Sequence, residues 1–216
     1  MSSYVITCGS TADLPHSYVT RRQIPYLCYR YSIGDQEHLD DLWQSVTSKE
    51  FYQRMDRGAM PVTTQVNVAQ YLEFFEPFLQ QGKDVLHVEF SSGLSGSCQS
   101  ALMARDELAH KYPDRQVLVV DTLAASSGYG LLVDAACDLR DSGAGMQEIY
   151  GWLTANRLTA QHWFFSTDLT HYKRGGRISA SAAVIGTLLN ICPLMFVNAQ
   201  GKLIPHSKLR GRRNAV

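Results

Sequence analysis

The chain has 216 residues, enough for one large domain or two small ones. Hydrophobic residues make up 45% of it and charged residues 19%, which allows a sizeable buried core and argues against an intrinsically disordered protein. Lys plus Arg and Asp plus Glu each number 20, so the net charge is zero and gives no sign of a nucleic-acid-binding protein.

The first predicted elements are a buried strand at residues 4–8 and an extended segment at 24–33. Both segments are rich in aromatic and β-branched side chains, which favour strands. Thr47 and Glu50 have the spacing of a capping box, so they predict a helix that ends near Gly58.

A second helix is predicted between Asn67, a good N-cap residue, and Gly82, and Pro77 should kink or shorten it. Thr63 and Thr64 are expected in the loop just before this helix. Their hydroxyl groups could cap the backbone locally, or they could bind an anion at the positive end of the helix dipole.

The loop at residues 91–96 carries serines and glycines between a predicted strand at 85–90 and a predicted helix at 97–112. Glycines allow close approach of a ligand, and the free N–H groups of the helix suit a phosphate or a carboxylate. The alternative is a serine-capped turn without a ligand. A strand at 116–121 completes a predicted βαβ unit.

Two more helices are predicted, one that ends near Asp141 and one at residues 146–156. The alternation of strands and helices predicts an α/β domain over residues 1–156, with a parallel sheet flanked by helices. In such sheets ligands bind beyond the carboxyl ends of the strands, where the polar loops lie.

The alternation changes after residue 156. A strand at 163–167, a helix at 182–189 and a hairpin built from 194–197 and 203–205 predict a smaller α+β domain over residues 157–216. A basic segment follows at its end, and such a segment is either a solvated surface or a contact for a partner or a phosphate.

The sequence lacks several common functional motifs. It has no G-x-S-x-G elbow of an α/β-hydrolase and no glycine-rich nucleotide-binding motif. The histidines show no metal-ligand spacing, and His87 is interpreted as a core residue because its strand is apolar. The cysteines form no C-x-x-C pair, which favours reduced, mostly buried thiols in a cytoplasmic protein: Cys8, Cys28, Cys98, Cys137 and Cys192.

No membrane segment is predicted. The N-terminus has neither a basic region nor an apolar one that would indicate a signal peptide. No charged residue occurs between Arg177 and Lys202, but polar residues and Pro193 interrupt this run, which therefore predicts a helix and a strand instead of a membrane span.

An ordered series of motifs over essentially the whole chain resembles the DegV family: Ser10–Pro15, Thr63–Gln65, Ser91–Gly96, Val120–Thr122, Arg174–Ile178 and Gly201–Leu203. Members of this family bind fatty acids, and some are the acyl-carrying subunit of bacterial fatty acid kinase. The resemblance implies an N-terminal α/β domain, a C-terminal α+β domain, and an acyl chain buried between or within them.

The resemblance also implies a carboxylate site. Thr63 and Ser92 match the family residues that hydrogen-bond the fatty-acid carboxylate, and Ser91 is the second choice for the serine. Two hydroxyl groups and nearby backbone N–H groups would form charge-assisted hydrogen bonds with this ligand.

For the basic residues, the resemblance implies less specific roles. Lys208, Arg210 and Arg212 match a segment that belongs to the kinase-facing surface of family carriers. Arg174 and Arg177 match a family motif, and they could contact phosphate or hold the two domains together.

The chain departs from the family pattern at three places. Gly9 stands where the family usually has Asp, and Thr64 and Val66 replace a usual serine and proline. Family members also continue beyond the position of Val216, with a histidine near the carboxylate, so the second domain is expected to lack part of its sheet and one pocket wall.

The sequence thus predicts a non-catalytic carrier that binds a long-chain fatty acid, needs no cofactor, and presents the carboxylate to a fatty acid kinase for phosphorylation. One alternative is a serine-dependent hydrolase or acyltransferase that uses Ser92 or Ser95. The other is an adaptor protein that binds a partner through the basic segment near its end.

Overall fold

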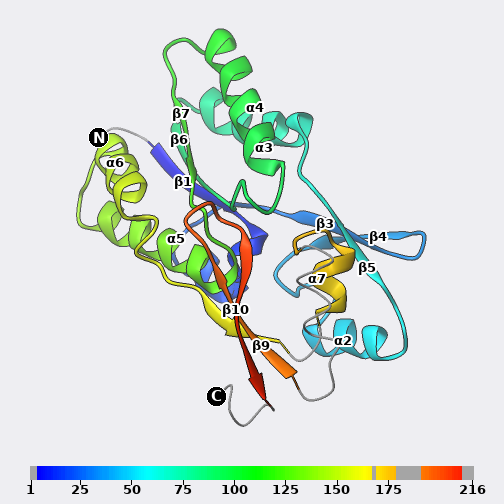
Figure 1. Ribbon diagram of the computed structural model, residues 1–216. Helices are drawn as coiled ribbons and strands as arrows, with labels where there is room; N and C mark the ends of the chain where they lie inside the picture. The colour runs from blue at the N-terminus through cyan, green and yellow to red at the C-terminus, as the bar shows by residue number, and fades with distance from the viewer. Residues whose placement is uncertain (1–3, 167–168, 179–190, 211–216) are drawn as a thin grey trace.

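The computed structural model describes residues 4–166, 169–178 and 191–210, and within them the strands form three sheets (Figure 1). The four-stranded sheet is parallel and has the order β2-β1-β6-β7. Its strands are β1 (Tyr4–Gly9), β2 (Tyr26–Leu27), β6 (Asp84–Glu89) and β7 (Val117–Asp121). The predicted α/β architecture with its βαβ unit is confirmed.

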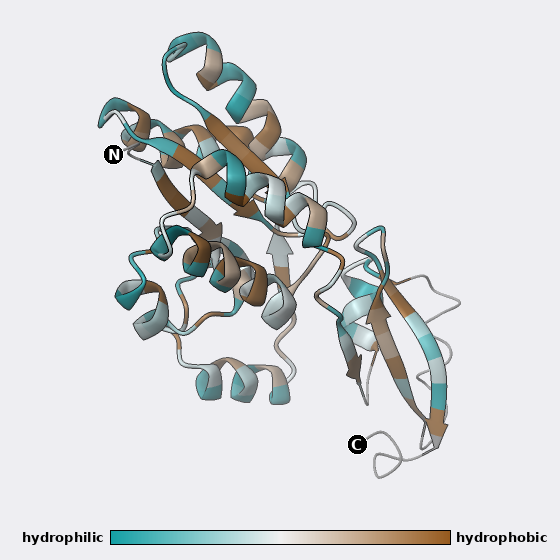
Figure 2. Ribbon diagram, turned by 90° about the vertical axis from the view of Figure 1, so that its left-hand side faces the viewer, coloured by the Kyte–Doolittle hydropathy of each residue, from teal (hydrophilic) through white to brown (hydrophobic). Residues whose placement is uncertain are grey.

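Helices cover both faces of this sheet, α3 (Val68–Gln80) and α4 (Ser97–Lys111) on one, α5 (Ser126–Asp141) and α6 (Met146–Asn156) on the other. Val85 and Val119 pack against the first pair, whereas Leu86 and Val120 pack against the second. Alternate residues of a strand point to opposite faces, so both faces of the sheet are buried and hydrophobic residues line both of them (Figure 2).

Helix α3 begins as predicted and continues past its proline. The Asn67 side chain accepts a hydrogen bond from the Gln70 backbone N–H, and the Gln70 side chain accepts one from the Asn67 N–H. Pro77 does not shorten the helix, because only one backbone donor is lost while Phe75 and Leu79 stay buried in the core on either side of it.

The second sheet is antiparallel, has the order β4-β3-β5, and lies beside α2 (Figure 1). These elements are β3 (Tyr29–Ile33), β4 (Gln36–Asp40), β5 (Pro61–Thr64) and α2 (Ser48–Asp56). The helix opens at Thr47 as predicted, but β5 is a correction, since Thr63 and Thr64 were expected in a loop. Their proline stands at the start of an edge strand, where the missing N–H is tolerated.

The third sheet is antiparallel with the order β10-β9-β8, and the helix α7 packs against it. Its elements are β8 (Trp163–Phe165), α7 (Thr170–Arg174), β9 (Ile191–Val197) and β10 (Leu203–Arg210). The predicted hairpin is confirmed, and Leu169, Ile178 and Met195 form a small core under it. The helix predicted at 182–189 lies outside the described residues.

Two short helices, η1 (Ser10–Ala12) and α1 (His16–Arg21), follow β1. Helix α6 ends at Asn156 and the third sheet begins at Trp163, but the division into domains 1–156 and 157–216 stays a prediction.

The core residues agree with the sequence analysis. His87 is fully buried, and so are all cysteines except the half-buried Cys28. Burial raises the pKa of the Cys98 thiol to about 12 and that of Cys137 to about 11, so both thiols are protonated and unreactive at neutral pH. In the part of the chain that the structure describes, no helix is long and apolar enough to span a membrane, and no cluster of side chains has the composition of a metal site.

Candidate functional site

The loop after β6 is a tight turn held by a buried serine. The backbone N–H of Ser91 donates to the carbonyl of Ala124, and the Ser91 carbonyl accepts from the N–H groups of Leu94 and Ser95. The Ser91 hydroxyl donates to the carbonyl of Gly201 at 2.8 Å. Ser91 therefore faces the protein interior and ties the loop to the β9–β10 hairpin.

Ser92 is exposed and points to the end of the neighbouring strand. Its hydroxyl donates to Asp121 Oδ2 at 2.6 Å, and its backbone N–H donates to Asp121 Oδ1 at 3.1 Å. The carboxyl ends of β6 and β7 are adjacent, because Glu89 pairs with Asp121 in the parallel register. A serine hydroxyl has a single proton, so Ser92 must release Asp121 before it can donate to a ligand carboxylate.

Thr63 lies in the edge strand β5, directly opposite Tyr31 of β3. Its side chain is exposed, and its hydroxyl has no hydrogen-bond partner among residues 4–166, 169–178 and 191–210. The neighbouring Thr64 hydroxyl donates to the Arg30 carbonyl instead. Within the described residues the Thr63 hydroxyl is thus unpaired, and it lies on a strand where a loop was expected.

The segment after β5 contacts the loop at residues 91–96, which is called the serine loop below. The Val66 backbone N–H donates to the Ser97 hydroxyl at 3.0 Å, and this hydroxyl lies 2.8 Å from that of Ser95. Gly96 also lies against this segment, because a Cβ there would stand 2.4 Å from the side-chain amide oxygen of Gln65. These contacts join the segment that follows β5, the strand of Thr63, to the loop that carries Ser92.

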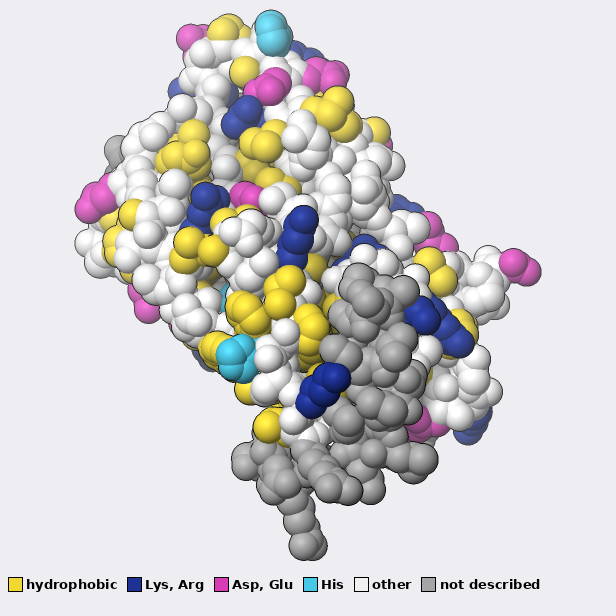
Figure 3. All heavy atoms as spheres, in the orientation of Figure 1, with side chains coloured by type: hydrophobic (Ala, Val, Ile, Leu, Met, Phe, Trp, Pro, Cys, Tyr) yellow, Lys and Arg dark blue, Asp and Glu magenta, His cyan; other side chains and the backbone are white. Residues whose placement is uncertain are grey.

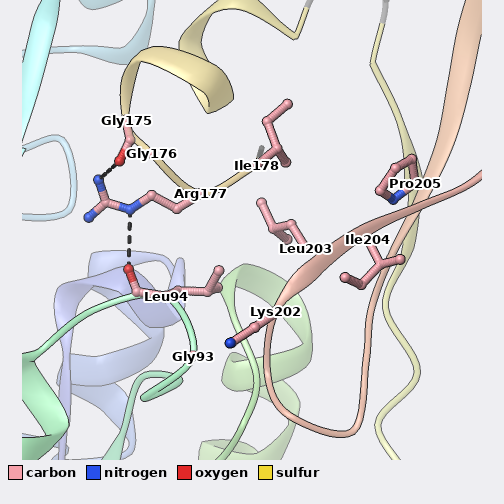
Figure 4. A pocket seen from close by; sticks show the side chains of 10 residues that line it. All are labelled: Gly93, Leu94, Gly175, Gly176, Arg177, Ile178, Lys202, Leu203, Ile204 and Pro205. Atoms are coloured by element: carbon pink, nitrogen blue, oxygen red, sulfur yellow. Dashed lines mark hydrogen bonds between the residues drawn. The ribbon is translucent and has the colours of Figure 1, made fainter. Parts of the chain in front are cut away.

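A cavity of about 500 Å³ opens beside this loop (Figure 4). Its lining includes Gly93, which follows Ser92 directly, and Arg177 and Lys202 contribute its cationic groups. Figure 4 shows Arg177 and Lys202 toward one side of the cavity with the Leu94 side chain between them, and the apolar side chains of Ile178, Leu203, Ile204 and Pro205 toward the other side. A cavity with cations at one side and apolar side chains at the other suits an amphipathic anion.

The two cavity cations are held differently. Arg177 Nε donates to the Leu94 carbonyl at 3.1 Å, and its Nη1 donates to the Gly175 carbonyl, so the guanidinium fixes α7 to the serine loop. Lys202 is exposed, and its ammonium has no ion-pair partner among the described residues. Lys202 is therefore the freer of the two charges.

Arg174, Lys208 and Arg210 are not part of this cavity lining. Arg174 is exposed and donates to the sulfur of Met60, next to β5. Lys208 is exposed on β10, opposite Pro193, and Arg210 ends the same strand, so both lie on a paired strand and not in a free tail. Figure 3 shows hydrophobic side chains gathered over the hairpin with Lys and Arg side chains near them. Arg212 lies outside the described residues.

Asp121 and Lys202 were not chosen from the sequence as site residues. The signal for Asp121 was its place directly after a buried strand that neighbours the serine loop. Lys202 belongs to the Gly201–Leu203 motif, but that motif did not predict its position at the cavity, which depends on the docking of the hairpin.

Comparison with known proteins gives one consistent result. The sequence model of the family described as "Uncharacterised protein, DegV family" matches residues 3–216. A DegV domain-containing protein of Clostridium perfringens is 43% identical over 100% of this chain and 74% of its own length.

Two solved structures show the same architecture. A Thermus thermophilus protein, described as a fatty-acid-binding DegV family protein, has a TM-score of 0.83 at 29% identity over 99% of this chain and 74% of its own. A stearic-acid-binding protein of Eubacterium ventriosum has a TM-score of 0.86 at 26% identity over 97% of this chain and 72% of its own.

Proposed function

The chain belongs to the DegV family, and from this premise we propose that it binds a long-chain fatty acid, with the carboxylate held by Thr63 and Ser92. The observation that carries the proposal is the cavity beside Ser92, whose lining combines two cations with apolar side chains. The Thermus and Eubacterium proteins are described as fatty-acid-binding proteins, which supports this class of ligand.

The division of binding energy follows from the chemistry of the ligand. Each methylene group that leaves water contributes about 0.8 kcal/mol, so the acyl chain supplies most of the affinity, less the cost of ordering it. The head group contributes charge-assisted hydrogen bonds from Thr63 and Ser92, which orient the ligand. Ser91 is the weaker choice, because its hydroxyl already donates to Gly201.

In this proposal the protein is a cytoplasmic carrier and not an enzyme. It presents the carboxylate to the catalytic subunit of a fatty acid kinase, which phosphorylates it to an acyl phosphate. Lys208, Arg210, Arg212 and Arg174 are the proposed contacts for that partner or for phosphate, since cationic side chains attract an acidic partner surface.

The first test measures fatty-acid binding to two variants, Thr63→Val and Ser92→Ala. Loss of a hydrogen bond to a charged group should weaken binding of palmitic acid about tenfold or more in each. Thr64→Val is the matched control, because adjacent strand residues point to opposite faces and the Thr64 hydroxyl donates to a backbone carbonyl. Equal affinity of all three variants and the wild type would refute the site.

The kinase role has a separate test. The protein loaded with palmitic acid is mixed with ATP and the fatty acid kinase catalytic subunit of the same organism, and acyl phosphate is trapped with hydroxylamine. Lys208→Glu should slow the reaction and leave fatty-acid affinity unchanged, because the residue is exposed on β10. An unchanged rate would remove Lys208 from the partner surface.

A serine hydrolase is the second candidate, and the 2.6 Å hydrogen bond from Ser92 to Asp121 is the observation in its favour. No histidine within the described part of the chain is bonded to either residue, and a carboxylate alone is a weak base for a serine. Labelling of Ser92 by a fluorophosphonate probe would support the hydrolase.

A further inference from the structure

A carboxylate is buried at the end of β6, next to the serine loop. Glu89 is fully buried, and each of its oxygens has two hydrogen-bond partners. Oε1 accepts from the Tyr29 hydroxyl at 2.7 Å and the Phe90 backbone N–H at 3.0 Å. Oε2 lies 2.5 Å from the Tyr71 hydroxyl and 2.6 Å from His87 Nε2.

These donors belong to the segments that carry the proposed site. Tyr29 begins β3, the strand that pairs with β5 and thus with Thr63. Tyr71 lies in the first turns of α3, the helix that follows β5 in the chain. Phe90 leads into the loop with Ser92. One carboxylate therefore connects both hydroxyl-bearing segments to the same strand of the central sheet.

The polar side chains around Glu89 all have hydrogen-bond partners, which favours a rigid cluster. The Tyr29 and Tyr71 pKa values lie well above the usual range, because burial and the neighbouring Glu89 charge both disfavour the phenolate, so both hydroxyls remain donors. His87 Nδ1 lies 2.9 Å from the buried Thr7 hydroxyl, so both ring nitrogens have partners. A buried charge that lost one of these donors would be strongly destabilised, which restricts movement of every attached segment.

We propose that Glu89 is a positioning residue, which sets the separation of Thr63 and Ser92 so that both hydroxyls reach one carboxylate. It touches no ligand itself. The inference rests on the proposed function, because it assigns how the two halves of that site are held together.

The test compares two ligands of equal chain length, palmitic acid and the corresponding fatty alcohol. Both bury the same chain, but only the acid has a carboxylate. The variants are Glu89→Gln, Tyr29→Phe and Tyr71→Phe. We expect the preference for acid over alcohol to fall about tenfold in Glu89→Gln, the equivalent of one charge-assisted hydrogen bond, and to fall in both tyrosine variants.

Tyr129→Phe is the matched control. Tyr129 is equally buried, on the opposite face of the sheet, and its hydroxyl donates to the Val88 carbonyl at 2.6 Å and accepts from the Gly9 N–H at 2.8 Å. Removal of the Tyr129 hydroxyl should lower the free energy of unfolding and leave the preference for the fatty acid over the fatty alcohol unchanged.

The outcomes separate the two proposals. If the wild type prefers the acid and every Glu89-cluster variant keeps that preference, the positioning role is overturned and the fatty-acid site stands. If the wild type binds no fatty acid, the proposed function fails and the positioning role with it. If Glu89→Gln does not fold, the two tyrosine variants make the same comparison.

Discussion

The Ser91 hydroxyl donates a 2.8 Å hydrogen bond to the carbonyl of Gly201, a residue 110 positions later in the chain. The two backbones approach closely at this point, since a Cβ at Gly93 would stand 2.4 Å from the Gln200 carbonyl oxygen. The serine loop and the turn of the β9–β10 hairpin thus form one packed unit, which is also one wall of the cavity.

Gly201→Ala should separate the hairpin from the loop. Gly201 has a φ of +70°, and an added Cβ would stand 2.0 Å from the Ser91 hydroxyl oxygen. Strain of this kind costs about 1–3 kcal/mol, so the urea midpoint of unfolding should fall and fatty-acid binding should weaken.

Gly151→Ala is the control for that substitution. Gly151 lies within α6, and among the described residues no atom outside its helix lies within 4 Å of the position of its Cβ. Alanine there should raise the free energy of unfolding by about 0.5–1 kcal/mol, because it favours the helix. A Gly201→Ala midpoint equal to that of the wild type would contradict the close packing of loop and hairpin.

Asp121→Asn should strengthen binding of a fatty acid. The substitution removes a negative charge beside Ser92, and the new amide NH₂ group cannot accept the hydroxyl proton, which becomes available to the ligand. We expect a several-fold lower Kd for palmitic acid, up to about tenfold. The fatty alcohol should bind as in the wild type, and weaker acid binding would show that Asp121 supports the ligand-bound state instead.

His162 should make stability depend on pH. Burial lowers the pKa of its imidazole, and Nε2 accepts from the Ala125 N–H at the start of α5. The unfolded chain therefore binds the proton more tightly than the folded one. Above about pH 6.5 the titration of His162 should leave the free energy of unfolding unchanged. That free energy should fall as the pH decreases through the lowered pKa that His162 has in the folded state.

The check on His162 is urea unfolding between neutral and mildly acidic pH, compared with His162→Gln. Glutamine can still accept from the Ala125 N–H but does not titrate, so the loss of stability on acidification should be smaller in the variant. Identical pH profiles would exclude His162 as the cause.

Gly9→Ala should disturb the Glu89 cluster from a distance. A Cβ at Gly9 would stand 2.8 Å from the Tyr29 ring, which would have to move away from Glu89. Gly9 has an ordinary φ of −92°, so backbone strain plays no part. Stability should fall by about 1–3 kcal/mol, as is typical of an overpacked core, and acid binding should weaken more than alcohol binding.

Much of the fold was predictable because it depends on local pattern. The strands of the parallel sheet contain short hydrophobic runs, and the capping box of Asn67 and Gln70 predicts the start of α3. Strand β5 escaped prediction because a four-residue edge segment that begins with Pro61 and carries exposed threonines has no hydrophobic alternation. Helix α7, with five residues, is likewise too short for a helical period to show.

The sequence by itself determined the α/β order of the elements, the burial of His87, and the polar loops at the carboxyl ends of the strands, because periodicity and capping act between residues close in the chain. Only the tertiary structure decided that Ser92 donates to Asp121, that Ser91 turns inward to Gly201, and that Glu89 joins Tyr29 to Tyr71. Each of these contacts joins residues from different elements, and their distances depend on how those elements pack.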